Sequence, residues 1–172
     1  FLRLQPVLTV ITNIEAEHLD HWESLDAIHA AFAEFADRVP FWGRTLACLD
    51  DPGVQTILPS LARPITTYGF SAQADLVAGE VDVHGDGMRF QVRHRGEPLG
   101  AVELPLPGRH NVSNALAALG VALELDVPFA TAAAALASFG GVERRFETVG
   151  IASGVRVVDD YAHHPTEIRA TL

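Results

Sequence analysis

The chain has 172 residues, of which 48% are hydrophobic and 20% are charged, and its formal net charge at pH 7 is −10. This composition is typical of a folded domain with a real core, and the acidic balance argues against general binding of nucleic acids, which need a basic surface. There is no apolar run of membrane-spanning length and no basic-then-apolar leader, so we expect neither a membrane helix nor a secretory signal.

Two residue counts limit the chemistry further. All twelve basic residues are arginines, so the chain cannot contain a G-x-x-x-x-G-K-[ST] phosphate loop or a lysine Schiff base. Cys48 is the only cysteine; it cannot form an internal disulfide, which fits a reducing cytoplasm, and we expect it to be a small buried residue. Because the chain starts without Met, we expect it to be excised from a longer protein. If that protein handles a nucleoside triphosphate, part of the site should lie outside this chain.

The first seventy residues alternate between strand and helix patterns. The opening segment is rich in β-branched residues and predicts a strand buried on both faces. Ser24 can cap the amphipathic helix that follows, and Pro40 should end it. Turn chemistry at Asp50-Asp51-Pro52-Gly53 leads into a shorter helix. The expected strands are residues 7–12, 45–49 and 64–70, and the expected helices are residues 25–39 and 52–61.

The pattern of apolar and turn residues changes after residue 70. Short, partly alternating segments separated by glycine-containing turns predict antiparallel hairpins beside a parallel sheet. Two helices follow, then a strand that ends in acid, and Pro165 suits the first turn of a last helix. The sequence therefore predicts an α/β fold, a mostly parallel sheet flanked by helices with an antiparallel hairpin region. These later elements are expected at residues 76–83, 88–95 and 101–106 (strands), 110–125 and 128–138 (helices) and 155–158 (strand).

Metal- and anion-binding side chains follow the first and last of these strands. Glu15 and His18 offer an oxygen and a nitrogen donor suited to holding Mg²⁺ or Mn²⁺ against a phosphate, although their spacing alone fits a solvated loop equally well. Residues 159–164 could hold sugar hydroxyls, a carboxylate or zinc. Arg144 and Arg145 can clamp an anion, with an ordinary surface pair as the alternative.

A third polar group lies at the start of the helix expected at 110–125. Asn111 and Asn114 share one face at i, i+3 spacing, and this face is lined by alanines, away from the leucine stripe. Both amides could therefore point into a cleft and read a purine edge or a ribose hydroxyl. Simple helix capping is the alternative.

The sequence strings that contain these polar groups, taken in their order along the chain, resemble those of the Mur ligase family. The resemblance spans nearly the whole chain, and its last two strings favour the member that adds L-alanine over the murein tripeptide ligase. The strings are TNIEAEHLD (12–20), VPFWG (39–43), GRHN with NA (108–111 and 114–115), RRF (144–146) and DDYAHHPTE (159–167).

The resemblance implies an enzyme of three domains, of which residues 1–150 would be the central ATP-binding domain without its phosphate-loop part. Residues 151–172 would be the hinge and the start of the C-terminal domain. The implied reaction transfers the γ-phosphate of ATP to the carboxylate of UDP-N-acetylmuramate, and L-alanine then attacks the acyl phosphate, in cytoplasmic peptidoglycan precursor synthesis. This segment alone should be inactive and should bind neither nucleic acid nor membrane. The alternatives are another Mur ligase and a non-catalytic α/β binding domain.

The same resemblance implies a role for each matched residue. Glu15 matches a metal-binding acid and His18 a second contact to the metal or phosphate. The sequence departs from the family where Glu17 replaces the usual Asp and where Asp37 stands in place of a His that binds metal in some members. The other implied roles are contacts to adenine and ribose (His110, Asn111, Asn114 and Asp160), to the phosphates (Arg145), and to the muramoyl carboxylate and incoming amino acid (Tyr161 and His163).

Overall fold

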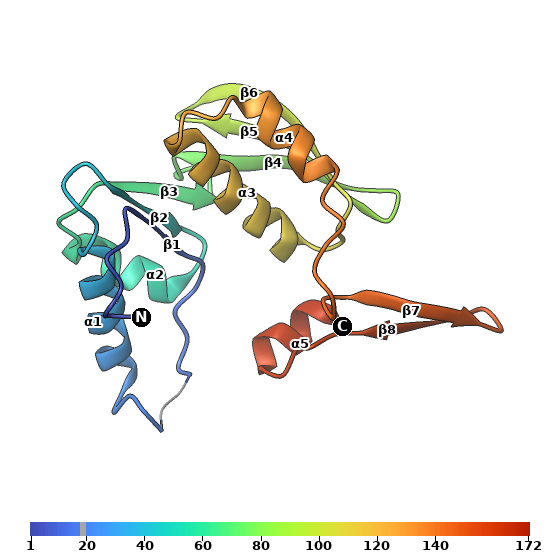
Figure 1. Ribbon diagram of the computed structural model, residues 1–172, viewed down its shortest axis with the longest axis horizontal. Coiled ribbons are helices and arrows are strands. Elements are labelled where there is room, and N and C mark those ends of the chain that lie inside the picture. The colour runs from blue at the N-terminus through green and yellow to red at the C-terminus, as the bar shows by residue number, and fades with distance from the viewer. Residues whose placement is uncertain (18–19) are drawn as a thin grey trace.

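A mixed sheet of six strands forms the body of the molecule in the computed structural model, which describes residues 1–17 and 20–172 (Figure 1). The strands lie in chain order, β1 to β4 parallel and β4 to β6 antiparallel. The expected α/β fold is confirmed, and the antiparallel hairpins adjoin the parallel strands in the same sheet. The strands are Leu8–Ile11 (β1), Arg44–Cys48 (β2), Ile65–Gly69 (β3), Leu76–His84 (β4), Gly87–His94 (β5) and Glu97–Leu104 (β6).

The opening strand β1 is not buried on both faces, and that prediction was wrong. Thr9 and Ile11 are buried, whereas Val10 is 39% exposed. Val10 pairs with Leu46 of β2 in the sheet, and Leu46 lies in the core beneath helix α3 (Arg109–Glu124). That helix packs on β2, β3 and β4. Since β1 is the edge strand one position further out, its corresponding face remains open.

Helix α1 (Leu25–Ala36) begins as predicted and ends earlier. The Ser24 side chain accepts a hydrogen bond from the Ala27 N–H and caps the first turn. At the other end Asp37 is the C-cap, and its carboxylate accepts the N–H groups of Ala62 at 2.9 Å and Arg63 at 3.1 Å. This contact fastens the end of α1 to the segment just before β3, and the helix ends at Ala36, three residues before the expected Val39.

The helices cover the two faces of the sheet in separate groups. Helix α1 and the short α2 (Pro52–Ile57), which a 3₁₀ turn at Leu58–Ser60 prolongs, form one core with β1 and β2. Helix α3 buries its Val112, Leu116 and Leu119 stripe on the opposite face, and α4 (Phe129–Ala137) packs on β6 and α3. Cys48 is buried in this second core, as expected.

The last part of the chain forms a separate two-stranded ribbon followed by a short helix (Figure 1). Strand β7 (Glu147–Ala152) pairs with β8 (Val155–Asp159), and α5 (Pro165–Thr171) ends the chain. We did not predict β7. Every residue in it is exposed, so no buried face requires an alternating apolar pattern, and an interior Gly150 weakens its strand pattern. Among the helices that the structure describes, none has the length and apolarity needed to cross a bilayer.

Candidate active site

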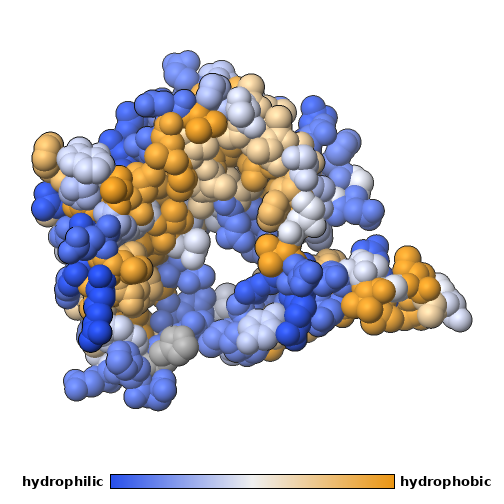
Figure 2. Space-filling model, viewed as in Figure 1, coloured by the Kyte–Doolittle hydropathy of each residue, from blue (hydrophilic) through white to orange (hydrophobic). Residues whose placement is uncertain are grey.

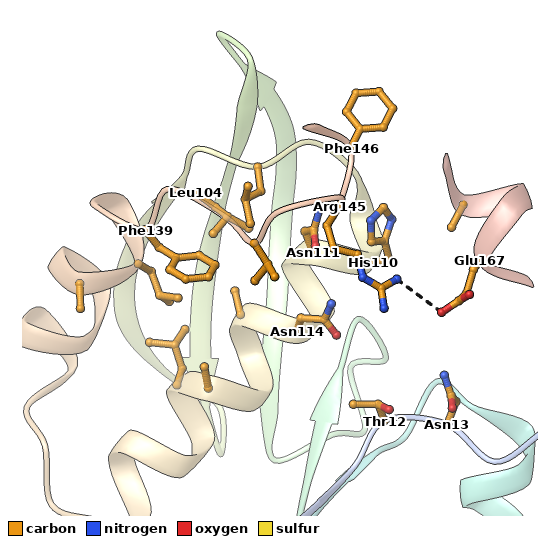
Figure 3. Close-up of a pocket in the computed structure, with 18 of the residues that line it drawn as sticks. Thr12, Asn13, Leu104, His110, Asn111, Asn114, Phe139, Arg145, Phe146 and Glu167 are labelled. Carbon is orange, nitrogen blue, oxygen red and sulfur yellow. Dashed lines mark hydrogen bonds and ion pairs between the residues drawn. The ribbon is translucent and has the colours of Figure 1, made fainter. Parts of the chain in front are cut away.

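A cavity of about 990 Å³ lies between α3, α4, the connecting segment 139–146 and α5 (Figure 3). Its lining is apolar toward α4 and polar toward α5. In the space-filling view, a hollow opens on this face between apolar side chains and the hydrophilic side chains around α5 (Figure 2). The polar residues of the lining are Thr12, Asn13, His110, Asn111, Asn114, Thr131, Arg145, Asp160, Thr166, Glu167 and Thr171.

The first two turns of α3 deliver three of these side chains, His110, Asn111 and Asn114. Gly108 adopts φ of 93° at the N-cap, a conformation that favours glycine, and so lets the helix start directly at Arg109. The Asn111 amide Nδ2 donates to the Pro107 carbonyl at 2.7 Å and so ties the helix to the loop before it. Asn114 is exposed and faces the cavity one turn later. The two amides thus share the cavity face, and Asn111 also has the local structural role that we considered as the alternative.

His110 lies near two charged groups, Arg145 of the connecting segment and Asp160 after β8. Burial lowers the pKa of the His110 imidazole; the nearby Asp160 carboxylate opposes this shift, and the Arg145 guanidinium adds to it. The lowered pKa favours the uncharged ring at neutral pH, in which one ring nitrogen can donate a hydrogen bond and the other can accept one. Such a ring suits a neutral, hydrogen-bonding ligand group such as a ribose or a base.

Asp160 fixes the connection between β8 and α5. Its carboxylate accepts the Ala162 N–H at 2.7 Å, the Phe146 N–H at 2.9 Å and the Thr171 hydroxyl at 3.3 Å. Burial opposes ionisation of this group, but these hydrogen bonds outweigh it and lower the pKa of the Asp160 carboxyl. The charged Asp160 thus holds together both chain segments that enter and leave the ribbon.

Arg145 and Glu167 meet across the polar end of the cavity. The Arg145 Nη1 lies 3.4 Å from Glu167 Oε1 (Figure 3). Glu167 Oε2 also accepts the N–H groups of His163 and His164, as part of a capping box at the start of α5. These N–H groups, followed by Arg145, lower the pKa of Glu167 from 4.5 to about 2.

The lowered pKa of Glu167 predicts how α5 responds to acid. Because the folded-state pKa lies below the ordinary value, the cap stabilises α5 above about pH 4.5 and is lost as the pH falls through about 2. We expect the backbone amide NMR signals of His163 and His164 to titrate with a midpoint near 2. Glu167→Gln should abolish this titration. A midpoint at 4 or above in the unaltered chain would show that the capping contacts do not form.

Glu15 lies just beyond the carboxyl end of β1. The loop that follows β2 holds the backbone next to Glu15 in place. Asp51 Oδ1 accepts the N–H groups of Ile14 at 3.1 Å and of Val54 at 2.8 Å, so it caps α2 and anchors the residue before Glu15. The backbone at Gly53 packs directly against the Ile14 carbonyl, where a Cβ atom would overlap with the oxygen. The turn residues after β2 therefore position the acid after β1.

The described part of this loop presents the Glu15 carboxylate, an oxygen donor of the kind that Mg²⁺ takes. The half-buried Glu15 carboxylate accepts a hydrogen bond from the Thr166 hydroxyl at 2.7 Å. His18, the second expected ligand, lies outside the described residues. Within residues 1–17 and 20–172, no three His, Cys, Asp or Glu side chains converge in a way that could hold a metal ion. Mg²⁺ needs no such group, since it retains several waters and takes one or two carboxylates together with substrate phosphates.

Tyr161 and His163 are not among the described residues that line the cavity. Their rings pack together at 5.2 Å, and His163 Nδ1 lies 3.1 Å from the Tyr161 carbonyl oxygen. Arg144 stacks over Tyr161 at 5.0 Å and pairs with Asp159 at 3.4 Å. These side chains form a cluster outside the cavity, and the substrate contacts expected of Tyr161 and His163 remain predictions.

Asp37 and Glu15 lie at opposite edges of the parallel part of the sheet. Its carboxylate binds the chain just before β3, at the amino edge of the parallel strands, whereas Glu15 follows the carboxyl end of β1. Asp37 therefore has a structural role and does not replace a metal-binding His.

Sequence reasoning missed several polar residues of the cavity. Thr12 and Asn13 directly follow β1, and Thr166 and Thr171 belong to α5. Three of them fall within the family strings, but uncharged side chains gave no separate signal for a site.

Comparison with known proteins agrees with this geometry. The family model described as the Mur ligase middle domain matches residues 2–122, and the one described as the glutamate ligase domain of Mur ligases matches residues 144–172. UDP-N-acetylmuramate–L-alanine ligases from Solibacter usitatus and Solidesulfovibrio magneticus are 52% and 53% identical to the chain over all 172 residues. The chain covers only 36% and 37% of their lengths.

Solved structures show the same arrangement of elements. MurF from Acinetobacter baumannii superposes with a TM-score of 0.83 at 28% identity, over 98% of this chain and 37% of that one. MurC from Thermotoga maritima, a UDP-N-acetylmuramate–alanine ligase, superposes with a TM-score of 0.82 at 26% identity, over 98% of this chain and 38% of that one. From the match of the middle-domain model to most of its length, and from whole-chain identities near one half, the chain belongs to the Mur ligase family.

Proposed function

We propose that this chain is the middle segment of a UDP-N-acetylmuramate:L-alanine ligase, an ATP-dependent enzyme of cytoplasmic peptidoglycan precursor synthesis. The observation that carries the proposal is the cavity that His110 and Asn114 of α3 line together with Arg145 of the connecting segment and Asp160, which follows β8. The whole-chain identity to ligases of that name supports the choice of substrates. We call the longer protein of this proposal the parent enzyme.

The two parts of the chain would have different tasks in the parent enzyme. Residues 1–150 would form the central domain without its phosphate loop, and residues 151–172 would form the hinge and the start of the C-terminal domain. The absence of lysine from the chain agrees with a phosphate-loop lysine supplied from elsewhere in the parent. The segment alone would then be inactive.

In this proposal the polar end of the cavity holds ATP. The uncharged His110 ring and the Asn114 amide would hydrogen-bond adenine and ribose, with Asn111 and Asp160 shaping the site through their contacts to Pro107, Phe146 and Ala162. The apolar end toward α4 would exclude water from the base.

The phosphate side would lie between Glu15 and Arg145. Glu15, with His18 as the expected second contact, would hold Mg²⁺, which offsets negative charge on the phosphoryl oxygens when bound. Arg145 would contribute a fixed positive charge toward the same oxygens as the muramoyl carboxylate takes up the γ-phosphate. L-Alanine would then displace phosphate from the acyl phosphate, with Tyr161 and His163 near the reacting carboxylate after hinge movement.

Phosphate release by the parent enzyme tests the proposal. With ATP, Mg²⁺ and UDP-N-acetylmuramate present, we expect release to require an amino acid and to be fastest with L-alanine, slower with glycine or L-serine. The tripeptide L-alanyl-γ-D-glutamyl-meso-diaminopimelate serves as the competing substrate, because a solved relative with 30% identity is named for it. Preference for the tripeptide would assign the chain to that branch of the family, and no amino-acid-dependent release at all would favour a non-catalytic binding domain.

A further inference from the structure

The first turn of α5 contacts two groups that, on the proposed function, both face the phosphates. Thr166 Oγ1 donates to Glu15 Oε2 at 2.7 Å, and the next residue, Glu167, pairs with Arg145 at 3.4 Å. Glu15 comes from the loop after β1 and Arg145, which lines the cavity, comes from the connecting segment, so one turn of α5 contacts two separate parts of the chain. One rigid helical turn therefore relates the position of the acid to that of the arginine.

We propose that Thr166 is a positioning residue that holds the Glu15 carboxylate when α5 closes against the loop after β1. The inference rests on the proposed function, since it gives Glu15 the task of holding the metal. A hydroxyl donor on one carboxylate oxygen fixes the rotation of the carboxylate plane and directs the other oxygen. Thr166 thus acts through Glu15 and does not itself touch the phosphates.

A second contact at the same junction supports closure as a defined state. His164, the N-cap of α5, has its Nδ1 3.4 Å from Glu17 Oε1, so the N-cap and the second residue of α5 contact two alternate residues of the loop after β1. A single long-range hydrogen bond between exposed side chains can be incidental, but paired contacts in register specify the orientation of the helix on the loop. Together the two contacts hold the start of α5 against the loop after β1.

The cap of α5 makes its first turn rigid enough for this role. Glu167 binds the N–H groups of His163 and His164, and Asp160 binds the Thr171 hydroxyl in the last turn. The helix is therefore fixed to the hinge at both ends. Moving the hinge moves Thr166 with it, which couples closure of the C-terminal part to the orientation of Glu15.

Matched substitutions in the parent enzyme test this role. Thr166→Val removes the hydroxyl with little change in shape, Thr166→Ser retains it, and Thr148→Val makes the same change at an exposed residue of β7 outside the cavity. The first readout is the affinity for Mn²⁺ in the presence of a non-hydrolysable ATP analogue, measured by electron paramagnetic resonance. The second is the distance distribution between spin labels at Glu23→Cys and Arg169→Cys, both exposed positions.

We expect Thr166→Val to weaken Mn²⁺ binding roughly threefold to tenfold, the range for one hydrogen bond to a charged group that is partly exposed, and to broaden the label distances toward longer values. Thr166→Ser should restore both properties, and Thr148→Val should change neither. Unchanged Mn²⁺ affinity in Thr166→Val, or equal losses in the Ser and Val variants, would overturn the proposal. Neither readout needs turnover, so a parent that shows these shifts without amino-acid-dependent phosphate release would refute the ligase function and leave the role of Thr166 intact.

Discussion

Glu15→Gln is expected to lower kcat/KM of the parent enzyme by about a hundredfold or more, the loss typical of removing one group that stabilises transition-state charge. Glutamine has the shape of glutamate and still offers an oxygen to the Thr166 hydroxyl, so the contact to α5 can persist. What disappears is the negative charge that would hold Mg²⁺ next to the phosphates. The measurement is steady-state phosphate release at saturating UDP-N-acetylmuramate and L-alanine, with ATP and Mg²⁺ each varied.

Glu23→Gln is the matched control for this prediction. Glu23 is an exposed acid eight positions further along the same connection, and it does not line the cavity. The control change removes the same charge from the protein, and we expect the rates to stay within twofold of the unaltered enzyme. Equal rates for the Glu15 and Glu23 variants would mean that the loop after β1 is only solvated, as in a non-catalytic binding domain.

Gly53→Ala is expected to reduce both stability and activity, although alanine is the better helix former. Gly53 lies in the first turn of α2, where its Cβ would overlap with the Ile14 carbonyl oxygen and lie 2.9 Å from the Ile14 Cβ. Backbone cannot move aside as a flexible side chain can, so Ile14 and the adjoining Glu15 must shift. We expect a loss of about 1–3 kcal/mol in the free energy of unfolding, the range for overpacking. Because a displacement near 1 Å is costly in an active site, kcat should fall roughly tenfold or more.

Gly79→Ala provides the comparison. Gly79 lies in β4, and a Cβ atom added there would have no heavy atom within 4 Å, apart from its chain neighbours, in the part of the chain that the structure describes. This change should alter the free energy of unfolding by no more than about 0.5 kcal/mol, as is usual at unconstrained surface sites. Chemical denaturation and turnover of both variants separate the two effects. A Gly53→Ala protein as stable and active as Gly79→Ala would show that α2 does not position Glu15.

Both predictions concern the short loops that follow β1 and β2. Asp51 connects them by binding Ile14 and Val54, and Asp50 continues the series by accepting the N–H groups of Phe70 at 2.7 Å and Ser71 at 3.0 Å after β3. The adjacent acids thus fasten the carboxyl ends of three parallel strands to one another. We interpreted them from sequence as turn residues only, because the distant N–H groups that they bind are brought near by strand pairing.

The sequence by itself determined the elements whose signals are local. The apolar stripes and the Ser24 cap predicted α1 and α3, and alternation with turn residues predicted β4 to β6. The ordered family strings also identified the family and brought attention to the cavity residues His110, Asn111, Asn114, Arg145 and Asp160. These features depend on residues near one another in the chain or on motif wording, so no tertiary contact was needed to see them.

The tertiary structure decided which side of each element is covered and which polar groups meet. The Val10 side chain is exposed because α3 covers the sheet only as far as β2. Strand β7 forms because β8 pairs with it, not because of its own sequence pattern. The contact between Thr166 and Glu15 joins residues 151 positions apart, and Asp37 proved to be a structural contact at the opposite edge of the sheet. Burial and long-range hydrogen bonds depend on where other segments lie, and hydropathy along one segment does not encode that.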